Sequence, residues 1–354
     1  MSDHTLTRQL EAWFKSNARD LPWRLDVRDP YHALVSELML QQTQVSRVLE
    51  KYQPFIDQFP TPQSLAQAPE EEVLAAWAGL GYYRRARMLH ACARAIVEHH
   101  DGIVPESVDE LMKLPGVGRY TAGAIASIVF HQREPIVDGN VIRVLLRLHN
   151  KSVSQTDKDT IKWAWQRAEE LVQASQKPAV FNEAMMELGA TRCTPKNIRC
   201  DQCPIRSHCA SFEQGTTESI PLPKPRTKQK RMYCATVIAT KSTANSESIL
   251  LEQRPSTGMW ANMFQAPTIE RDDREHDAEE ITTHLGVGAD CIEPAGSFTH
   301  ITTHRIVEFR VYRVKTDKSN LKPSKKQAYR TIDTLDQVAL SNAQRKAIAI
   351  AGIL

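Results

Sequence analysis

The sequence predicts an all-α domain at the N-terminus followed by a smaller α+β domain, and three observations indicate this division. Up to about residue 190, apolar residues recur at helical spacing, as in LVSELMLQQTQVSRVL. After residue 231, segments such as YCATVIAT, SILLEQR and RIVEFRVYRV have the pattern of strands. Between them, PLPKPRTKQKR (residues 221–231) combines three prolines with five basic residues, which suits a linker. We therefore expect domains at residues 1–220 and 232–354.

Local signals place individual elements within this outline. Asp29 before Pro30 is a favourable N-cap and first-turn pair for a helix that carries Glu37. TDKDTIKWAWQRAEELVQA begins with similar capping chemistry. RIVEFRVYRV alternates apolar and polar residues, as a half-buried strand does. SNAQRKAIAIAGIL should close the chain as a helix capped by Ser341 or Asn342.

The totals favour a globular cytoplasmic protein. The length of 354 residues leaves room for two domains, and 41% hydrophobic and 25% charged residues are ordinary values. No apolar run approaches the roughly 20 residues of a membrane-spanning helix, and MSDHTLTRQLEAW lacks the pattern of a signal peptide. A net charge of +3 is too small to indicate nucleic-acid binding by itself. We expect no membrane partner.

Four of the seven cysteines predict a metal site. They lie in CTPKNIRCDQCPIRSHC, residues 193–209, with six, two and five residues between successive cysteines. The odd total of seven cysteines, with four of them in one short stretch, argues against a disulfide framework. Zinc and an iron–sulfur cluster both accept four thiolates, so the spacing leaves both open. Four protein ligands leave no open position for a substrate, which favours a structural role. The ligands would be Cys193, Cys200, Cys203 and Cys209.

The segment LPGVGRYTAGAI, residues 114–125, predicts a tight turn before a helix. Gly116 and Gly118 permit positive φ and a close approach of the backbone. The backbone N–H groups at the start of the following helix could bind an anion, such as a DNA phosphate. Taken alone, a Gly-x-Gly is more often part of an ordinary loop.

Together these motifs resemble the helix-hairpin-helix superfamily of DNA base-excision glycosylases. The hairpin LPGVGRYTA, Asp138 in PIVDGNVIRVLLRLH and the cysteine spacing all match the family pattern. The resemblance implies a six-helix barrel, an iron–sulfur module and one [4Fe–4S] cluster on the four cysteines. Within the superfamily, RDLPWR, DPYHALVSELMLQQTQV, GLGYYRRAR and FNEAMMELGA resemble the adenine glycosylases of the MutY type over nearly the whole chain. The implied partner is duplex DNA with adenine opposite 8-oxoguanine or guanine, bound by a monomer.

The resemblance implies three catalytic residues. Glu37 would protonate adenine at N7, as a partly desolvated carboxyl with a raised pKa could, although a glutamate on a helix is more often solvated. Asp138 would stabilise the positive charge on the sugar, although it could equally cap a helix. Tyr120 stands where bifunctional relatives resembling endonuclease III carry a Schiff-base lysine. We therefore expect a monofunctional glycosylase, with a glycosylase/lyase as the alternative.

Further positions match family contacts to the base and to DNA. The adenine pocket would be lined by Arg19, Leu21, Trp23, Arg24 and Glu183. DNA binding and mismatch probing would involve Leu40, Gln42, Tyr82, Gly116 and Gly118. Without the resemblance, the leucine and the tyrosine would be read as core residues.

The second domain resembles the Nudix-like module of these adenine glycosylases. The loop GSFTHITTH matches an element that senses 8-oxoguanine, here Phe298, Thr299 and His300, with threonine in place of the family serine. Thr299 retains the hydroxyl group that the family serine carries. REHDAEEITTHLG departs from the metal-binding box of Nudix hydrolases in its spacing, so nucleotide hydrolysis is not expected. A DNA-binding scaffold without catalysis is disfavoured because Glu37 and Asp138 are both present.

Overall fold

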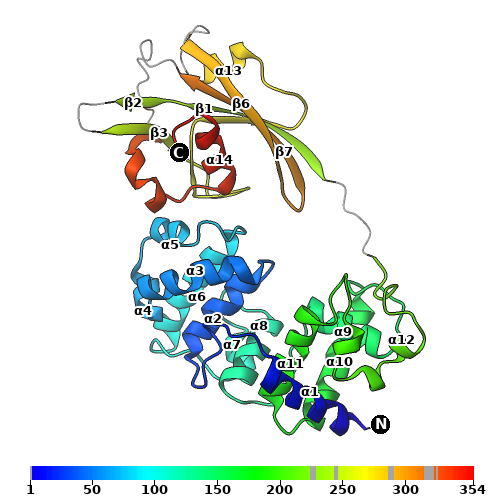
Figure 1. The fold of residues 1–354 in the computed structure, drawn as a ribbon. Helices are drawn as coiled ribbons and strands as arrows, with labels where there is room; N and C mark the ends of the chain where they lie inside the picture. The colour runs from blue at the N-terminus through cyan, green and yellow to red at the C-terminus, as the bar shows by residue number, and fades with distance from the viewer. Residues whose placement is uncertain (1, 224–228, 243–245, 286–290, 315–322, 324–325) are drawn as a thin grey trace. The chain divides into compact units, whose positions relative to one another are not determined.

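The chain forms two compact units in the computed structural model, which describes residues 2–223, 229–242, 246–285, 291–314, 323 and 326–354 (Figure 1). The first unit comprises Met1–Gln67 and Met88–Pro225, and the second comprises Ala68–Arg87 and Arg226–Leu354. Residues 224–228 of the predicted linker lie outside the described residues. Among the helices described, none is long and apolar enough to cross a membrane.

The first unit is built of helices, as the apolar periodicity predicts. Its larger helices are α1 (Asp3–Asn17), α2 (Pro30–Leu40), α3 (Val45–Gln58), α6 (Arg84–His99, which begins in the second unit), α9 (Gly139–Leu148), α10 (Lys158–Ala174) and α11 (Pro178–Thr191). Shorter ones are α4 (Pro62–Gln67), α7 (Val108–Leu111), α8 (Arg119–Ala124) with the π-helical η1 (Ile125–Val129), the 3₁₀ turns η2 (Cys200–Gln202) and η3 (Arg206–His208), and α12 (Ala210–Glu213).

Capping side chains start several of these helices. Asp29 accepts a hydrogen bond from the His32 backbone N–H at 2.8 Å, and Pro30 follows it, so α2 begins as predicted. Ser341 accepts from the Gln344 N–H in the same way at the start of the last helix. Asp157 precedes α10 but makes no capping hydrogen bond, so the capping chemistry expected there is absent.

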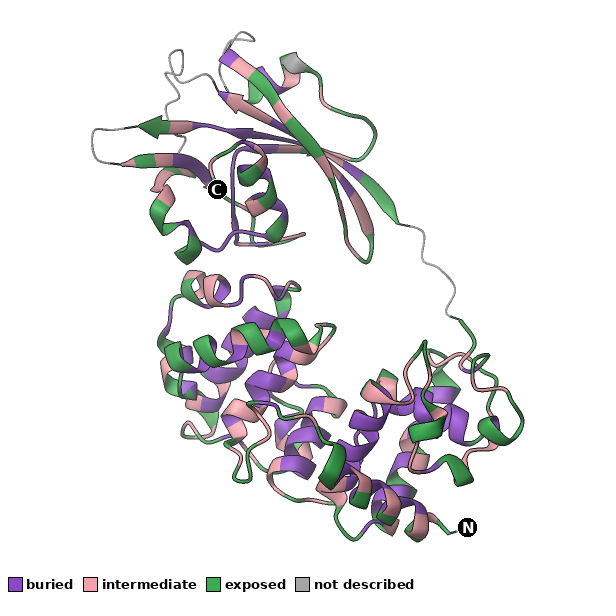
Figure 2. Cartoon of the chain, viewed as in Figure 1, coloured by how far each residue is buried: buried purple, intermediate pink, exposed green. Residues whose placement is uncertain are grey.

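A buried apolar cluster joins α1, α9, α10 and α11. Leu10, Leu145, Leu171 and Leu188 are each fully buried in it, and the inward faces of the helices are coloured accordingly in Figure 2. Burial of such side chains stabilises the fold by about 1.5–3 kcal/mol each. Gly189 of α11 lets that helix approach the start of α9, because a Cβ there would lie 2.8 Å from the Asn140 Cβ. The packing therefore holds the N-terminal end of α9 against α11.

The second unit is an α+β fold with two sheets, which confirms the predicted class. One sheet has the strand order β5-β1-β7-β6, with β1 parallel to β7, and the other has the order β2-β3-β4, with β8 paired to β3. The strands are β1 (Lys230–Ile238), β2 (Thr240–Ser242), β3 (Glu247–Gln253), β4 (Phe264–Gln265), β5 (Thr268–Arg271), β6 (Ile292–Ile301), β7 (Arg305–Val314) and β8 (Gln327–Thr331). The helices are α5 (Glu70–Ala76), α13 (Ala278–Leu285), the 3₁₀ helix η5 (Ile332–Gln337) and α14 (Asn342–Ile350).

Candidate active site

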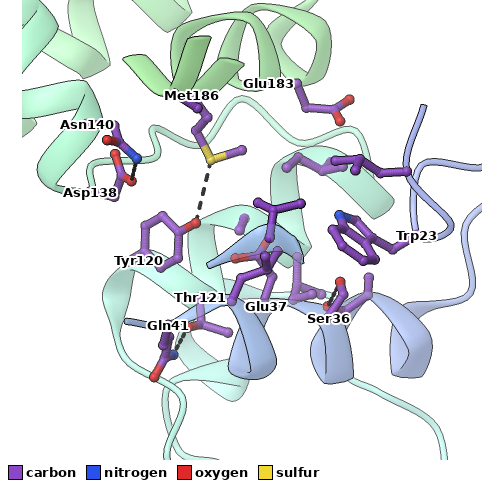
Figure 3. A pocket seen from close by; sticks show the side chains of 18 of the residues that line it. Trp23, Ser36, Glu37, Gln41, Tyr120, Thr121, Asp138, Asn140, Glu183 and Met186 are labelled. Atoms are coloured by element: carbon purple, nitrogen blue, oxygen red, sulfur yellow. Dashed lines mark hydrogen bonds between the residues drawn. The ribbon is translucent and has the colours of Figure 1, made fainter. Parts of the chain in front are cut away.

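The first unit contains a cavity of about 890 Å³ that gathers most of the predicted site residues (Figure 3). Every predicted catalytic and adenine-pocket residue lines it, and so do four of the predicted DNA-contacting residues. The predicted residues found there are Arg19, Leu21, Trp23, Arg24, Leu40, Gln42, Glu37, Gly116, Gly118, Tyr120, Asp138 and Glu183. These residues come from segments far apart in the chain, so the tertiary fold assembles the cavity.

Glu37 presents a buried carboxyl group to this cavity from α2. Its Oε2 atom is buried without a hydrogen-bond partner among the described residues. Burial raises the Glu37 pKa to about 7, and the charges of Asp138 and Glu183 add to the effect, whereas the Tyr120 hydroxyl and the Arg28 guanidinium oppose it. Near neutral pH a large fraction of Glu37 therefore carries a proton that it can give away.

Tyr120 occupies the second position of α8 and remains a neutral phenol. Burial raises its pKa well above the ordinary value, and the charges of Glu37 and Asp138 raise it further. The Tyr120 hydroxyl lies near enough to Glu37 to lower the pKa of that carboxyl, and it donates a hydrogen bond to Met186 Sδ at 3.5 Å.

Asp138 caps α9 and lines the cavity at the same time. Its Oδ1 accepts from the Val141 N–H at 2.7 Å, and its Oδ2 accepts from the Asn140 side chain at 2.9 Å. Burial raises the Asp138 pKa, although these hydrogen bonds oppose the change. The capping role and the predicted catalytic role are thus compatible, because the cap fixes the carboxylate at the cavity wall.

Five charged side chains form a network of ion pairs along one wall of the cavity. Arg28 donates to both carboxylate oxygens of Glu183, at 3.0 and 2.8 Å, and Arg24 Nε lies 3.4 Å from Glu183 Oε1. Arg19 donates to both oxygens of Glu187, at 2.6 and 3.0 Å, and Arg24 donates to Glu187 Oε2 at 2.8 Å. Arg24 therefore links the two carboxylates.

Sequence reasoning missed two members of this network, Arg28 and Glu187. The Glu187 side chain is fully buried, and although burial opposes it, Arg19 and Arg24 hold its pKa below the ordinary value. A signal was available, because Glu183 and Glu187 are four residues apart and residues at that spacing share a helix face. Two acidic residues on one face of a buried helix indicate that basic side chains from another segment pack against that face.

The glycine hairpin forms one edge of the cavity. Gly116 has a φ of 79°, and a Cβ there would lie 2.5 Å from the Met88 Cβ, so both the turn and the packing require glycine. Gly118 is the N-cap of α8 and has open space beside it. Gln42 lies near the same edge with a φ of 54°, a conformation that non-glycine residues seldom adopt outside constrained sites.

Tyr82 is the predicted DNA-contacting residue that does not line this cavity. It belongs to the second unit, has a φ of 47°, and is 49% exposed. Its hydroxyl shares a hydrogen bond of 3.0 Å with the Thr303 hydroxyl, and the Arg85 guanidinium lies 5.4 Å from its ring centroid. The high exposure excludes the alternative reading of Tyr82 as a core residue.

The four clustered cysteines lie close together beside α9. Arg147 donates to Cys193 Sγ at 3.3 Å, and the Cys209 thiol donates to the Arg147 carbonyl at 3.5 Å. Burial raises the Cys203 pKa to about 12, and charge on the other three cysteines adds to the increase. Within the part of the chain that the structure describes, no three His, Cys, Asp or Glu side chains gather around a single ion position. Thiolates are ligands that both zinc and iron–sulfur clusters accept.

The three predicted lesion-sensing residues lie on β6, whereas the sequence placed them in a loop. Phe298, Thr299 and His300 pair with Phe309, Glu308 and Val307 of β7. The loop expectation was wrong because β7 offers a continuous ladder to this segment. The strand ends at Ile301, just beyond these residues.

The acidic helix α13 does not present a free metal-binding carboxylate at Glu280. Hydrogen bonds from the Asp277 backbone and from Arg274 and Arg271 hold the Glu280 pKa at about 2. Arg274 Nη2 lies 2.6 Å from Glu280 Oε1.

A helical fold with a glycine hairpin and buried carboxylates in one cavity defines a base-excision DNA glycosylase. The family model described as "HhH-GPD superfamily base excision DNA repair protein" matches residues 35–170, and the NUDIX domain model matches residues 240–349. The solved structure of a thermostable thymine-DNA glycosylase is 28% identical, covers 60% of this chain and 97% of its own, and has a TM-score of 0.55.

Curated relatives show which kind of DNA glycosylase this chain resembles. Adenine DNA glycosylase of Rattus norvegicus is 34% identical over 400 residues, covering 97% of this chain and 77% of the relative. Adenine DNA glycosylase of Mycolicibacterium smegmatis is 42% identical over 216 residues, covering 59% of this chain and 71% of the relative. The chain belongs to the adenine DNA glycosylase family.

Proposed function

We propose that this protein removes adenine opposite 8-oxoguanine or guanine from duplex DNA by hydrolysis and leaves an abasic site. The observation that carries the proposal is the Glu37 carboxyl group, whose Oε2 atom is buried without a partner among the described residues and whose pKa of about 7 suits a general acid at neutral pH. Membership of the adenine DNA glycosylase family supports adenine as the base removed.

Glu37 would act on the base and Asp138 on the sugar. Glu37 protonates N7 of an adenine turned out of the duplex, so that the electron pair of the breaking C1′–N9 bond can move into the base. Positive charge develops on the deoxyribose, and the Asp138 carboxylate stabilises it. Water then adds to C1′ and loses a proton. Tyr120, neutral at the cavity wall, can donate a hydrogen bond to the reacting groups.

The ion-pair network would bind the base. Arg24 and Glu183 supply a donor and an acceptor at the cavity wall, and adenine offers both an amino group and ring nitrogens. Leu21 and Trp23 supply apolar surface beside them, with Trp23 packed edge-on against Tyr52 at 5.3 Å between ring centroids. The surrounding ion pairs fix these groups before the base arrives.

The cavity favours a monofunctional enzyme over a glycosylase/lyase. No lysine occurs among the described residues that line it, and the Tyr120 phenol has no amine with which to form a Schiff base. Borohydride added during turnover on duplex DNA carrying adenine opposite 8-oxoguanine should therefore trap no covalent adduct while adenine is released. A strong adduct that survives substitution of lysines elsewhere and blocking of the N-terminus would contradict this proposal.

The rate of adenine release should follow the protonation of Glu37. A general acid works only while protonated, so the single-turnover rate constant should fall about tenfold per unit well above the Glu37 pKa of about 7. It should also fall at low pH, where Asp138, whose pKa is raised by burial, becomes protonated. Arg28→Met removes a charge that lowers the Glu37 pKa, so the high-pH limb should move to higher pH. Arg47→Met, at an exposed pair with Glu50, is the control and should not move it. A shift of the Arg28→Met limb to lower pH would contradict the assignment.

DNA would be held through the hairpin and the exposed probing residues. The N–H groups that follow Gly118 at the start of α8 suit a backbone phosphate. Leu40 and Gln42, at the cavity, and Tyr82, in the second unit, are proposed to contact the opened base pair. Thr299, with its two neighbours on β6, would sense 8-oxoguanine. We propose that the protein acts on DNA as a monomer.

The four cysteines would hold one [4Fe–4S] cluster with a structural role. A single zinc ion draws four sulfurs to about 2.3 Å from one point, whereas a cluster spreads its thiolates over four irons. The cluster is supported by the spacing of Cys193, Cys200, Cys203 and Cys209, which matches the pattern of the helix-hairpin-helix glycosylases. The buried Arg147 guanidinium at Cys193 adds positive charge beside the thiolates.

A further inference from the structure

Met186 of α11 holds the hydroxyl group of Tyr120 at the wall of the cavity (Figure 3). The hydroxyl donates a hydrogen bond to Met186 Sδ at 3.5 Å. Met186 follows Glu183 by three residues, a spacing that places two side chains on one helix face, and both line the cavity. A thioether sulfur is a weak acceptor of hydrogen bonds. The contact therefore fixes where the Tyr120 proton points without binding it strongly.

Packing keeps the Met186 sulfur in this position. The Met186 side chain is partly buried against two apolar clusters. One is formed by Ala124, Ile128 and Ile136, and the other joins α1, α9, α10 and α11. Tyr120 packs against the first of these clusters as well. A methionine side chain has three rotatable bonds and adapts its shape readily when it is not confined. Contact with both clusters therefore holds Sδ beside the hydroxyl.

The Tyr120 hydroxyl has a second acceptor within reach, the Glu37 carboxyl group. A hydrogen bond from the hydroxyl lowers the Glu37 pKa, because it stabilises the ionised carboxylate. Tyr120 itself stays protonated, since burial and the charges of Glu37 and Asp138 raise its pKa well above the ordinary value. The hydroxyl has a single proton to donate. Met186 and Glu37 therefore compete for one hydrogen bond.

The protonation state of Glu37 decides between the two acceptors. A hydrogen bond to a neutral carboxyl group is roughly half as strong as one to a carboxylate. While Glu37 keeps its proton, the fixed sulfur can retain the hydroxyl. Once Glu37 has given that proton to adenine N7, its carboxylate is the stronger acceptor, and the O–H group needs only to turn about the bond between ring and oxygen. An interaction that strengthens as the proton leaves lowers the barrier to its transfer.

We propose that Met186 is a positioning residue for proton transfer from Glu37: its sulfur holds the Tyr120 hydroxyl weakly until Glu37 becomes a carboxylate, which then takes over the hydrogen bond. The inference rests on the proposed function and deepens it, because it names the group that keeps Tyr120 from stabilising the carboxylate too early. One proton moves from Glu37 to adenine N7, and Tyr120 keeps its own throughout. Met186 acts through Tyr120 rather than on the base.

Two substitutions of Met186 should move the high-pH limb of the rate profile in opposite directions. Met186→Leu keeps the volume but removes the acceptor, so the hydroxyl donates to Glu37 before as well as after proton transfer, and the limb moves to lower pH. Met186→Gln places an amide oxygen at a similar reach, so the hydroxyl stays away from Glu37 and the limb moves to higher pH. Each shift should be about 0.5–1 pH unit, the effect of one hydrogen bond.

The measurement is single-turnover adenine release by the full chain, in excess over a duplex with adenine opposite 8-oxoguanine, across the pH range. The maximal rate of Met186→Gln should also fall by about threefold to tenfold, because Tyr120 no longer turns to the carboxylate. The position of the limb does not depend on the fraction of enzyme that is folded. A change in limb position therefore reports on the site rather than on stability.

The charged groups around Glu37 are the same in both variants. Asp138 of α9 and Glu183 of α11 raise its pKa, and Arg28 lowers it. Opposite shifts therefore cannot come from these three groups. Met185→Leu is the matched control, because Met185 is 2% exposed and is not among the described residues that line the cavity. Its substitution should leave the limb where it is.

Tyr120→Phe shows whether the effect passes through the hydroxyl. In that background, Met186→Leu and Met186→Gln should have the same high-pH limb. The inference alone is overturned if the two substitutions leave the limb in place, move it in the same direction, or still move it in opposite directions without the Tyr120 hydroxyl. A wild-type chain that binds the duplex and releases no adenine would overturn the proposed function, and the inference with it.

Discussion

Replacing Glu37 with glutamine should slow single-turnover adenine release by about 100- to 10,000-fold, the usual contribution of a positioned general acid. Glutamine has nearly the same shape but no acidic proton to place on the base. Because the Glu37 pKa is about 7, the carboxyl is largely neutral below pH 6, and there the amide replaces a neutral group with another neutral group. The fold and the affinity for duplex DNA should therefore change little.

A matched control for this variant is Glu11→Gln. Glu11 is also a buried glutamate of the first unit, but it accepts a hydrogen bond from Ser175 at 2.6 Å and does not line the cavity. Its substitution should leave the rate of adenine release unchanged. Release and duplex binding are measured for both variants. If Glu37→Gln keeps full activity, the acid is another group. If the wild-type chain binds the duplex but releases no adenine, the non-catalytic scaffold becomes the better reading.

Replacing Glu187 with alanine should lower the free energy of unfolding of the first unit by about 3 kcal/mol. The change leaves Arg19 without its carboxylate partner and leaves Arg24 with Glu183 alone. Breaking a buried ion pair from one side typically costs about 3–5 kcal/mol. The cost falls at the lower end because the Arg19 side chain is 36% exposed and can turn to water. Urea unfolding followed by the helical circular dichroism signal measures it.

Glu170→Ala provides the comparison for this variant. Glu170 pairs with Arg167 at 2.7 Å, but its side chain is 58% exposed, so its loss should cost less than about 1 kcal/mol. Glu187→Ala should also weaken adenine release, because Arg24 loses the contact that holds it beside Glu183. Equal losses of unfolding free energy in the two variants would show that the buried ion pairs of Glu187 stabilise the first unit no more than an exposed ion pair does.

Much of the fold follows from local chemistry that a sequence displays. Asp29 and Pro30 start α2 because a carboxylate can accept from a free N–H group and proline lacks one. The spacing of apolar residues along the sequence likewise distinguishes the helical unit from the unit with sheets, because it follows the period of each element. Long-range pairings are different: Arg19 and Glu187 are 168 residues apart, and no local pattern specifies that they meet. The strand around Thr299 was likewise missed because its ladder depends on β7.

The sequence by itself determined which chemical groups this protein has: a tyrosine rather than a lysine at position 120, four cysteines at cluster spacing and two carboxylates in the family motifs. Only the tertiary structure decided what those groups can do. The Glu37 pKa of about 7 arises because α2, α8, α9 and α11 together exclude water from its carboxyl and place Asp138 and Glu183 nearby. Desolvation and Coulomb interactions depend on surroundings in space, so a raised pKa cannot be read from neighbours in sequence.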